Sequence, residues 1–313
     1  MKLVIQIPCY NEEKTLPVIL GNLPRNVEGF SIVEWLLIDD GSSDNSIQVA
    51  EQHNVDHILS LKINKGLAKV FMEGLNHAVS LGADVIVNID ADNQYSANDI
   101  PQIVQPILDK KADMVIGARP IDQISHFSFI KKRLQKIGSF FVRKLSHTNI
   151  EDAPSGFRAF SKETALKLNV FNQYTYTLET IIQAGIKNFS VVSIPIHTNP
   201  QLRPSRLIKS IFSYIRKSIN TMLRISVIYN PFKFFMTIGS ALFIIGFALG
   251  VRFLVYYFLR NGTGHVQSLI LASIMLGMGF QTVLVAFLAD LLFVNRNILE
   301  DIQYRIRRQD AEK

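Results

Sequence analysis

The sequence predicts an α/β domain with a doubly wound parallel sheet, followed by an amphipathic helix and two transmembrane helices. In residues 1–204, short β-branched apolar runs alternate with segments of helical periodicity, which is typical of parallel strands joined by crossover helices. The runs at 234–259 and 266–294 are almost wholly apolar, and each is longer than the roughly 20 residues that a helix needs to cross a bilayer. A buried helical hairpin is the alternative for these two runs.

The expected elements follow one another in the order that this fold class requires. In chain order they are a strand at 2–7, a helix at 16–23, a strand at 33–38, a helix at 46–53, a weak strand at 58–61, a helix from 66 to about 81, strands at 85–89 and 114–117, helices at 126–146 and 176–184, and a last strand at 189–196. Neither a Gly-x-Gly-x-x-Gly segment after the first strand nor a Gly-Lys-Ser/Thr loop occurs. Their absence argues against a dinucleotide oxidoreductase and a P-loop NTPase.

The strand at 85–89 is an apolar run that ends in two carboxylates, Asp90 and Asp92. Open α/β sheets bind ligands at the carboxyl ends of their strands. Two carboxylates there suit one hard divalent cation, and Mg2+ or Mn2+ held by few carboxylates completes its coordination with water and substrate phosphates. The expected ligand is a nucleotide diphosphate. A strand cap followed by a turn is the alternative, because Asp-Ala-Asp-Asn also favours turns.

Two more polar loops are expected at the same edge of the sheet, after residues 7 and 38. Asp40, in the second loop, suits a nucleobase because a carboxylate accepts the imide or amide N–H of uracil or guanine. An Asx turn explains Asp40 equally well. Lys65 would offset diphosphate charge, although a solvated lysine at a helix N-terminus is the simpler interpretation.

Charge and composition indicate a membrane location. The net charge is +7, and basic residues flank the pair of apolar runs while their connecting loop holds only Arg260. The positive-inside rule therefore predicts that both termini are cytoplasmic, and no cleavable signal peptide is expected. The excess charge beside the membrane favours anionic lipid over nucleic acid, for which no recognition motif is present. The single cysteine excludes an intrachain disulfide.

Four regions are predicted: a cytoplasmic domain at 1–204, an amphipathic juxtamembrane helix at 205–232, a transmembrane hairpin at 233–295 and a basic cytoplasmic tail at 296–313. The apolar and basic faces of the amphipathic segment favour a helix in the membrane interface, with packing against the soluble domain as the alternative. Gly246-x-x-x-Gly250 allows close helix contact, either within the hairpin or between protomers of a homo-oligomer.

The polar segments belong to a series of short motifs. They are Ile7-Pro8-x-Tyr10-Asn11-Glu12-Glu13, Asp39-Asp40-Gly41-Ser42-x-Asp44, Asn64-x-Gly66, Asp90-Ala91-Asp92-x-Gln94, Ile116-Gly117-Ala118-Arg119, Ser155-Gly156-Phe157-Arg158 and Arg203-Pro204-Ser205-Arg206. In this order and spacing they resemble family 2 glycosyltransferases with the Rossmann-like GT-A fold. The resemblance covers nearly the whole chain and is to the dolichyl-phosphate mannosyltransferase and undecaprenyl-phosphate glycosyltransferase branch.

The resemblance implies a donor site for a UDP- or GDP-sugar with Mg2+ or Mn2+. Asp90 and Asp92, with Ala91 between them, would hold the metal and the diphosphate, and Gln94 would lie beside the donor sugar. Asp40 would contact the base, and the nucleoside pocket would include Pro8, Tyr10, Asn11 and Glu12. The family pattern usually continues Asp-Ala-Asp-Leu-Gln, so Asn93 departs from it where a leucine is usual.

The resemblance also implies an acceptor site for a polyprenyl phosphate. The basic helix at 126–146 would lie at its mouth, which makes Lys132 and Arg133 candidates for binding the lipid phosphate. A solvated helix face is the alternative interpretation of this helix. Further candidates for contacts to the acceptor or the diphosphate are Arg158, Arg203, Ser205 and Arg206.

Two more residues, Arg119 and Asp152, are expected near the catalytic centre. Some relatives carry an aspartate directly before the Phe-Arg pair, where this chain has Gly156, so Asp152 is the nearest substitute for a base. The chemistry tolerates the loss of a base, because a phosphomonoester has a second pKa of about 6 and is largely dianionic at neutral pH.

Together these features predict a membrane-anchored inverting glycosyltransferase that transfers a monosaccharide from a nucleotide sugar to a polyprenyl phosphate. Two alternatives remain. An enzyme that extends a glycolipid or polysaccharide is less well supported, because no Gln-x-x-Arg-Trp segment occurs and the sole tryptophan, Trp35, lies in the second strand. A non-catalytic membrane adaptor that keeps the fold is opposed by the retained carboxylates.

Overall fold

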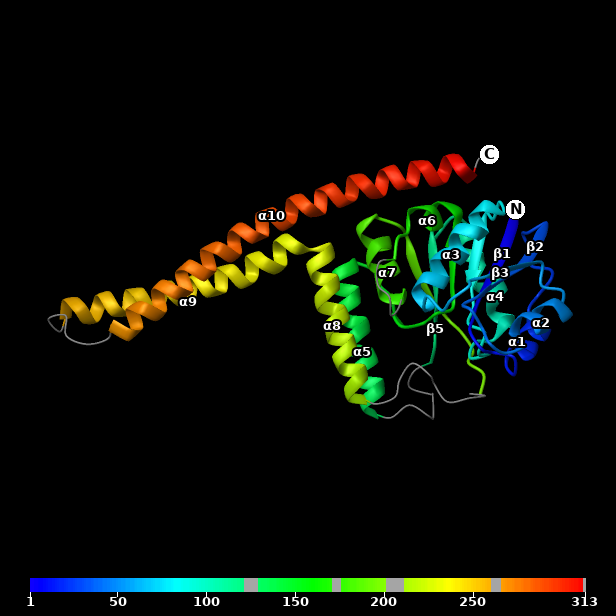
Figure 1. The fold of residues 1–313 in the computed structure, drawn as a ribbon, viewed down its shortest axis with the longest axis horizontal. Helices are drawn as coiled ribbons and strands as arrows, with labels where there is room; N and C mark the ends of the chain where they lie inside the picture. Colours follow the sequence, from blue (N-terminus) through cyan, green and yellow to red (C-terminus); the bar gives the residue numbers. More distant parts are fainter. Residues whose placement is uncertain (121–128, 171–175, 201–210, 260–265, 312–313) are drawn as a thin grey trace. The chain divides into compact units, whose positions relative to one another are not determined.

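The computed structural model describes residues 1–120, 129–170, 176–200, 211–259 and 266–311 (Figure 1). The chain divides into two compact units. The first contains Met1–Ile215 together with Ile302–Lys313, and the second contains Arg216–Asp301. The end of the expected basic tail therefore belongs to the first unit.

The first unit is built on a seven-stranded sheet in the order β3-β2-β1-β4-β6-β5-β7. The strands are β1 (Lys2–Cys9), β2 (Ile32–Asp39), β3 (His57–Ser60), β4 (Val85–Asn88), β5 (Met114–Ala118), β6 (Arg158–Ser161) and β7 (Val191–Pro195). Neighbouring strands are parallel except that β6 is antiparallel to β4 and β5. The prediction of a wholly parallel sheet is therefore wrong at β6. This strand has only four residues and begins with a charged one, so it lacks the apolar run by which the other strands were predicted.

The carboxyl ends of β1, β2 and β4 meet at one edge of the sheet. β1 pairs in parallel with β2, with Cys9 opposite Asp39, and with β4, with Gln6 opposite Asn88. The loops that follow these three strands therefore begin side by side. This confirms the expectation that the three polar loops leave the same edge.

Helices lie on both faces of the sheet. They are α1 (Leu16–Asn22), α2 (Ser46–Gln52), α3 (Leu67–Ser80), α4 (Ile100–Leu108), α5 (Phe129–Ser146), α6 (Lys162–Lys167) and α7 (Thr177–Ile186), with a 3-10 turn at Ala97–Asp99. The sequence did not predict α4 and α6. Pro106 lies inside α4, and proline normally breaks a helix, whereas α6 has only six residues.

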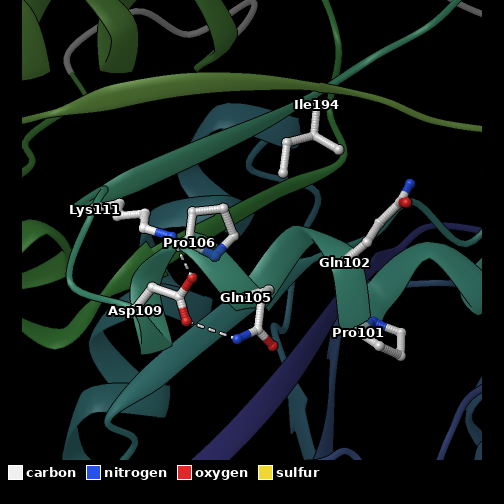
Figure 2. A pocket seen from close by; sticks show the side chains of 7 residues that line it. All are labelled: Pro101, Gln102, Gln105, Pro106, Asp109, Lys111 and Ile194. Atoms are coloured by element: carbon white, nitrogen blue, oxygen red, sulfur yellow. Dashed lines mark hydrogen bonds and ion pairs between the residues drawn. The ribbon is translucent and has the colours of Figure 1, made fainter.

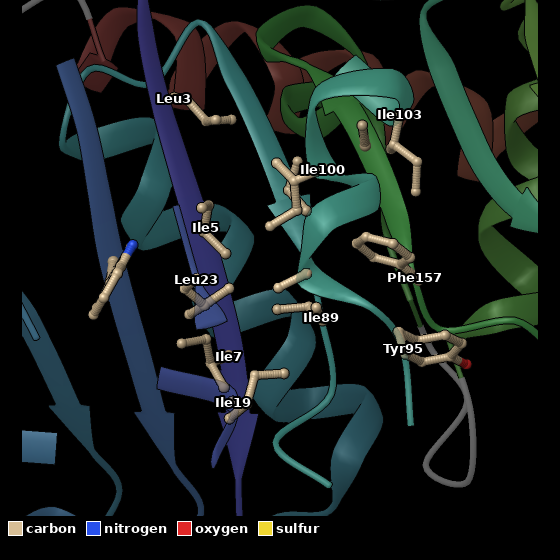
Figure 3. Packing of buried hydrophobic residues seen from close by; sticks show 14 of the residues in the cluster. Leu3, Ile5, Ile7, Ile19, Leu23, Ile89, Tyr95, Ile100, Ile103 and Phe157 are labelled. Carbon is tan, nitrogen blue, oxygen red and sulfur yellow. The ribbon is translucent and has the colours of Figure 1, made fainter. Parts of the chain in front are cut away.

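The main core lies between the sheet and the helices α1 and α4 (Figure 3). Leu3, Ile5 and Ile7 alternate along β1 and are fully buried on this face, as the two-residue period of a strand requires. Each such side chain contributes about 2 kcal/mol to stability on burial. Tyr95 and Phe157 extend the core toward the loop edge, with ring centroids 5.5 Å apart.

The second unit contains most of α8 (Ile211–Tyr229), α9 (Pro231–Leu259) and α10 (Val266–Ala311) as far as residue 301. Both α9 and α10 are long and apolar enough to cross a membrane, and only 11% and 17% of their most apolar windows are buried. Helices at the core of a soluble protein would be mostly buried. The interpretation of these runs as a buried hairpin therefore finds no support in the part of the chain that the structure describes.

Small residues bring α9 and α10 together. A Cβ atom added to Gly246 would lie 2.8 Å from the backbone nitrogen of Leu276, and one added to Gly279 would lie 2.7 Å from that of Phe243. A Cβ atom added to Gly250 would meet no atom within 4 Å. Of the two glycines in the expected motif, only Gly246 is therefore used within the hairpin, and homo-oligomer formation stays a prediction.

The end of α10 belongs to the first unit and contacts α6. Arg307 Nη1 donates to the carbonyl oxygens of Leu166 and Leu168, at 3.3 and 3.0 Å, and Lys167 Nζ lies 4.9 Å from the centre of the Tyr304 ring. Arg307 thereby satisfies carbonyls at the carboxyl end of α6 that the helix leaves unpaired. The helix that begins as the second apolar run thus ends as part of the first unit.

Candidate active site

The loops after β1 and β2 are joined by hydrogen bonds between side chains and backbone. The amide of Asn11 donates to Ser42 Oγ at 2.8 Å, and the amide of Ser43 donates to Asn11 Oδ1 at 2.8 Å. The amide of Glu12 donates to Ser46 Oγ at 2.8 Å. Asn11 has a φ of +53°, which asparagine tolerates better than most residues. These bonds fix the position of the residues that were predicted to bind the nucleoside.

Within this predicted nucleoside pocket, Tyr10 presents the most accessible side chain. It is 42% exposed, whereas Pro8 is buried within β1. Glu12 is also buried, and its Oε2 accepts a 2.7 Å hydrogen bond from the Thr15 hydroxyl. Tyr10 is therefore the residue of this group that is best placed to contact a ligand from solvent.

Asp40 fixes the beginning of α3. Its Oδ1 accepts the amide of Lys65 at 2.6 Å and its Oδ2 accepts the amide of Gly66 at 2.9 Å. Burial raises the pKa of Asp40, and these two N–H groups oppose the rise. A carboxylate has about four acceptor positions, so contact with a base stays a prediction. The side chain of Lys65 is exposed beside Asp40.

The loop after β4 leaves one carboxylate oxygen without a partner. Among the residues that the structure describes, Asp90 Oδ1 is buried and accepts no hydrogen bond. Burial and the charge of Asp92 raise the pKa of Asp90 to about 7, although Arg119 and Arg158 oppose this effect. Asp92 Oδ1 accepts the amide of Gln94 at 3.1 Å, which orders the residues that follow.

Gly156 packs directly against Asp90. A Cβ atom at position 156 would stand 2.6 Å from Asp90 Oδ2 and 3.0 Å from the Tyr176 hydroxyl. Any larger residue would therefore displace the Asp90 carboxylate. This explains in physical terms why the chain carries glycine where some relatives were expected to carry aspartate.

The carboxylates Asp90 and Asp92 fit a divalent metal. A buried carboxylate oxygen without a partner, next to a second carboxylate, is the oxygen donor set that Mg2+ and Mn2+ favour. The described part of the chain contains no group of three or more His, Cys, Asp or Glu side chains that could hold an ion. An ion held by these two carboxylates would complete its coordination with substrate phosphates and water.

Arg119 and Asp152 form a buried bidentate ion pair. Arg119 Nε lies 2.6 Å from Asp152 Oδ2, and Nη2 lies 3.0 Å from Oδ1. Burial alone would lower the pKa of Arg119, but the charge and hydrogen bonds of Asp152, together with the charges of Tyr95 and Asp90, outweigh burial and raise it. Both oxygens of Asp152 are engaged by Arg119. The prediction that Asp152 acts as a base therefore loses its geometric support, and its geometry is that of a residue that orients Arg119.

The expectation that Arg158 contacts the acceptor phosphate is wrong in this structure. The side chain is fully buried. Its guanidinium donates to the carbonyl oxygens of Ser155, Thr177 and Ala153 and to the hydroxyl of Thr180, at 2.6 to 2.8 Å. These donors point into the protein and hold together the loop before β6 and the beginning of α7.

The other predicted acceptor residues are only partly described. Arg133 is exposed on α5. The backbone of Lys132 belongs to α5, but its side chain lies outside the described residues. Arg203, Ser205 and Arg206 lie entirely outside the described residues. Their predicted contacts with the acceptor stay predictions.

Sequence reasoning missed a buried polar network beneath the site. Gln6 Nε2 donates to Asn88 Oδ1 at 2.8 Å, and Asn88 Nδ2 donates to the Gly156 carbonyl oxygen at 2.9 Å. On the other side of the same residue, the Gly156 amide donates to the Tyr95 hydroxyl oxygen at 2.9 Å. Gly156 is therefore held against Asp90 from both sides. The signal was present, because Gln6 and Asn88 are polar residues in otherwise apolar strands.

A shallow depression lies on α4, away from these loops (Figure 2). Its lining is drawn from α4, the residues that follow it and one residue of β7, namely Pro101, Gln102, Gln105, Pro106, Asp109, Lys111 and Ile194. Asp109 accepts hydrogen bonds from Gln105 and Lys111, at 2.7 and 2.9 Å. None of these residues belongs to the loops after β1, β2 and β4, so this depression is not the predicted donor site.

Sequence comparison identifies related enzymes. A dolichyl-phosphate N-acetylglucosaminyltransferase of Methanococcus voltae, which uses UDP-N-acetylglucosamine, is 29% identical over 61% of this chain and 83% of that protein. An undecaprenyl-phosphate mannosyltransferase of Micrococcus luteus is 27% identical over 63% of this chain and 83% of its own length. An undecaprenyl-phosphate 4-deoxy-4-formamido-L-arabinose transferase of Salmonella choleraesuis is 29% identical over 81% of this chain and 76% of that protein.

Solved structures share the fold. Glucosyl-3-phosphoglycerate synthase from Mycobacterium tuberculosis, solved with Mn2+, UDP and glucosyl-3-phosphoglycerate, aligns with a TM-score of 0.53 over 72% of this chain and 78% of that one, at 16% identity. At this identity the likeness concerns the GT-A fold alone. The model of Glycosyl transferase family 2 matches residues 4–168, more than half of the sequence. The chain therefore belongs to glycosyl transferase family 2 and has the GT-A fold that its motifs predicted.

Proposed function

We propose that the protein transfers a monosaccharide from a UDP- or GDP-sugar to a polyprenyl phosphate, undecaprenyl or dolichyl, with Mg2+ or Mn2+ as cofactor. The related transferases from three organisms support this acceptor class, because their names specify dolichyl or undecaprenyl phosphate. The observation that carries the donor side is the buried Oδ1 of Asp90 beside Asp92, which no described residue satisfies, at the edge of the sheet where open α/β folds bind ligands.

On this proposal Asp90 and Asp92 hold the metal, which neutralises charge on the departing nucleotide diphosphate. Arg119 supplies a fixed positive charge near Asp90, and Asp152 keeps it in place. Gln94 lies beside the donor sugar, on the loop that Asp92 orders. Charge placed in advance where charge develops in the transition state is usually the largest catalytic contribution.

The acceptor phosphate requires little activation. Its oxygen attacks the anomeric carbon on the face opposite the departing diphosphate, so the new glycosyl phosphate has inverted configuration. A phosphomonoester with a second pKa of about 6 is mostly dianionic at neutral pH, and catalysis then depends mainly on positioning. This accounts for an acceptor site that functions while both oxygens of Asp152 are bound to Arg119.

The proposed setting is the cytoplasmic face of the cell membrane. Two helices are long and apolar enough to cross a bilayer, and the basic residues that flank them favour cytoplasmic termini. We keep 1–204 as the catalytic domain, 205–232 as the interfacial segment, 233–295 as the hairpin and 296–313 as the basic tail. The catalytic domain would then lie on the same side of the membrane as the headgroup of the acceptor.

A transfer assay tests the proposal. Detergent-solubilised protein is incubated with Mn2+, undecaprenyl or dolichyl phosphate and labelled UDP- and GDP-sugars, and label entering the organic phase is counted. We expect label from one donor, and a loss of at least a hundredfold in Asp92→Asn. Asp109→Asn makes the same change on the remote surface of α4 and should retain wild-type rates.

Other outcomes would favour other functions. Label that accumulates in polymer or extended glycolipid would support the chain-extending enzyme. A broad donor panel that yields no product with folded protein, together with no nucleotide binding, would overturn the proposal and support the non-catalytic adaptor.

A further inference from the structure

The segment after β7 runs antiparallel to the loop that follows Asp92. The amide of Ser96 donates to the His197 carbonyl oxygen at 3.3 Å, and the amide of Asn199 donates to the Gln94 carbonyl oxygen at 3.0 Å. Tyr95 and Thr198 form an antiparallel β-bridge between these two bonds. The loop that carries Gln94 is therefore bound along its length to a segment about one hundred residues later in the chain.

The Asn199 side chain adds the closest connection. Its Nδ2 donates to the carbonyl oxygens of Asn93 and Tyr95, at 3.1 and 3.2 Å, and lies 3.4 Å from Asn93 Oδ1. Asn93 is only 8% exposed and has a φ of +57°. Asparagine tolerates this left-handed conformation better than leucine does. Asn93, which departs from the family pattern, is therefore well suited to this backbone conformation.

A second contact anchors the base of the same segment. The amide of His197 donates to Asp99 Oδ2 at 2.6 Å, and His197 Nδ1 lies 2.9 Å from Asp99 Oδ1. The Asp99 side chain is 7% exposed, whereas that of His197 is 84% exposed. Asp99 therefore fixes the backbone at the start of the segment that carries Asn199.

We infer that Asn93 and Asn199 are positioning residues for the donor site, which set the backbone between Asp92 and Gln94. This inference rests on the proposed function for its kinetic readout. Asn93 supplies the left-handed backbone, and Asn199 holds the carbonyl groups on either side of Gln94.

Substitutions at position 93 separate a conformational role from a packing role. Asn93→Gly keeps the left-handed backbone and the bond from Asn199 to its carbonyl, so donor kcat/KM should stay within about threefold of wild type. Asn93→Leu and Asn93→Ala disfavour this backbone and should lower donor kcat/KM by roughly tenfold to a hundredfold. Packing would predict the reverse order, with leucine best and glycine worst.

Substitutions at position 199 test the hydrogen bonds. Asn199→Ala removes them, and Asn199→Asp places a carboxylate oxygen against two carbonyl oxygens, so both should resemble Asn93→Leu. Asn188→Leu is the matched control, because Asn188 also has a φ of +57°. Asn188 is exposed and precedes β7, whereas Asn199 follows this strand. It should leave donor kcat/KM unchanged.

Hydrogen exchange in the metal-free protein provides a readout that does not depend on activity. The amides of residues 94–99 should exchange at least tenfold faster in Asn199→Ala than in wild type. Wild-type protein without transfer activity would overturn the proposed function only, and the exchange measurement would still decide this inference. Unchanged exchange in Asn199→Ala, or an active wild type with Asn93→Leu equal to Asn93→Gly, would overturn the inference.

Discussion

Two acidic side chains in the site, Asp90 and Asp152, are held in opposite ways. Both oxygens of Asp152 are paired with Arg119, whereas Asp90 Oδ1 is buried without a hydrogen-bond partner among the described residues. A buried polar group without a hydrogen bond lowers stability by about 1–3 kcal/mol. A ligand that binds to the group would remove this cost. Asp152 is therefore fully paired within the protein, whereas Asp90 keeps one buried oxygen that no described residue satisfies, as does Ser155 with its Oγ in the loop before β6.

The arginines show the same contrast. Arg119 is paired with a carboxylate, whereas the partners of Arg158 among the described residues are carbonyl and hydroxyl oxygens. Burial lowers the pKa of Arg158 to about 10, while Asp152 and the neighbouring Tyr95 and Asp90 together outweigh burial and raise that of Arg119. Arg158 thus holds the loop together, and Arg119 provides the stable charge next to Asp90.

The largest change in stability is expected when the ion pair between Arg119 and Asp152 is broken. Asp152→Asn should lower the free energy of unfolding by about 3–5 kcal/mol, because it leaves the buried charge of Arg119 without a partner. The double variant Arg119→Gln/Asp152→Asn should recover most of this loss, since no buried charge then remains. Thermal unfolding in detergent measures both.

The same double variant separates stability from function. Its lipid transfer should stay at least a hundredfold below wild type, because the charge beside Asp90 is gone. A double variant as unstable as Asp152→Asn would contradict the ion-pair explanation. Recovery of transfer along with stability would show that Arg119 does not act in the site.

The raised pKa of Asp90 predicts that the stability of the metal-free protein depends on pH. The pKa of Asp90 rises on folding from 3.8 to about 7, so between these values the folded state binds a proton that the unfolded chain does not. The stability of the metal-free protein should therefore fall as the pH rises through this window. Asp90→Asn should be more stable than wild type by about 1–3 kcal/mol at pH 8, with little difference near pH 4.

Thermal unfolding in EDTA across this range measures the effect, and added Mn2+ provides the control. The metal should stabilise wild type at pH 8 and leave Asp90→Asn unchanged. Parallel stability profiles for the two proteins in EDTA would mean that Asp90 is not the titrating group.

A smaller effect tests how Gly156 is held against Asp90. Tyr95→Phe keeps the ring that packs on Phe157 and removes the oxygen that accepts the Gly156 amide. The free energy of unfolding should fall by about 1 kcal/mol. A loss of 3 kcal/mol or more would show that the hydroxyl has a larger structural role than this single bond.

The fold was predictable to the extent that its elements carry local periodicity. β1, β2, β4 and β5 are apolar runs, and their order along the chain predicts that three loops share one edge. β6 begins with Arg158, which is buried by partners from the preceding loop and from the beginning of α7, and no local pattern reveals such a strand. For the same reason Arg158 was predicted to contact the acceptor phosphate, whereas its guanidinium donates to groups inside the protein.

The site was predictable where a motif lies within one loop, and not where loops meet. Asp90 and Asp92 follow one strand, so their proximity is fixed by sequence. The pairing of Asp152 with Arg119 spans 33 residues and two loops, and that of Asn199 with Asn93 spans 106. Pairings of this kind depend on strand order, and in particular on the antiparallel β6, which the sequence did not predict.

Calorimetry of nucleotide binding is the sharpest test of a metal-dependent donor site at Asp90 and Asp92, because it requires neither acceptor nor membrane. UDP and GDP are titrated into wild type and Asp92→Asn, each with Mn2+ and with EDTA. We expect wild type to bind one of the two nucleotides with Mn2+, and EDTA or Asp92→Asn to weaken this binding at least tenfold. Equal binding of the nucleotide in EDTA, or undiminished binding by Asp92→Asn, would contradict the assignment of Asp90 and Asp92 to a metal-dependent donor site.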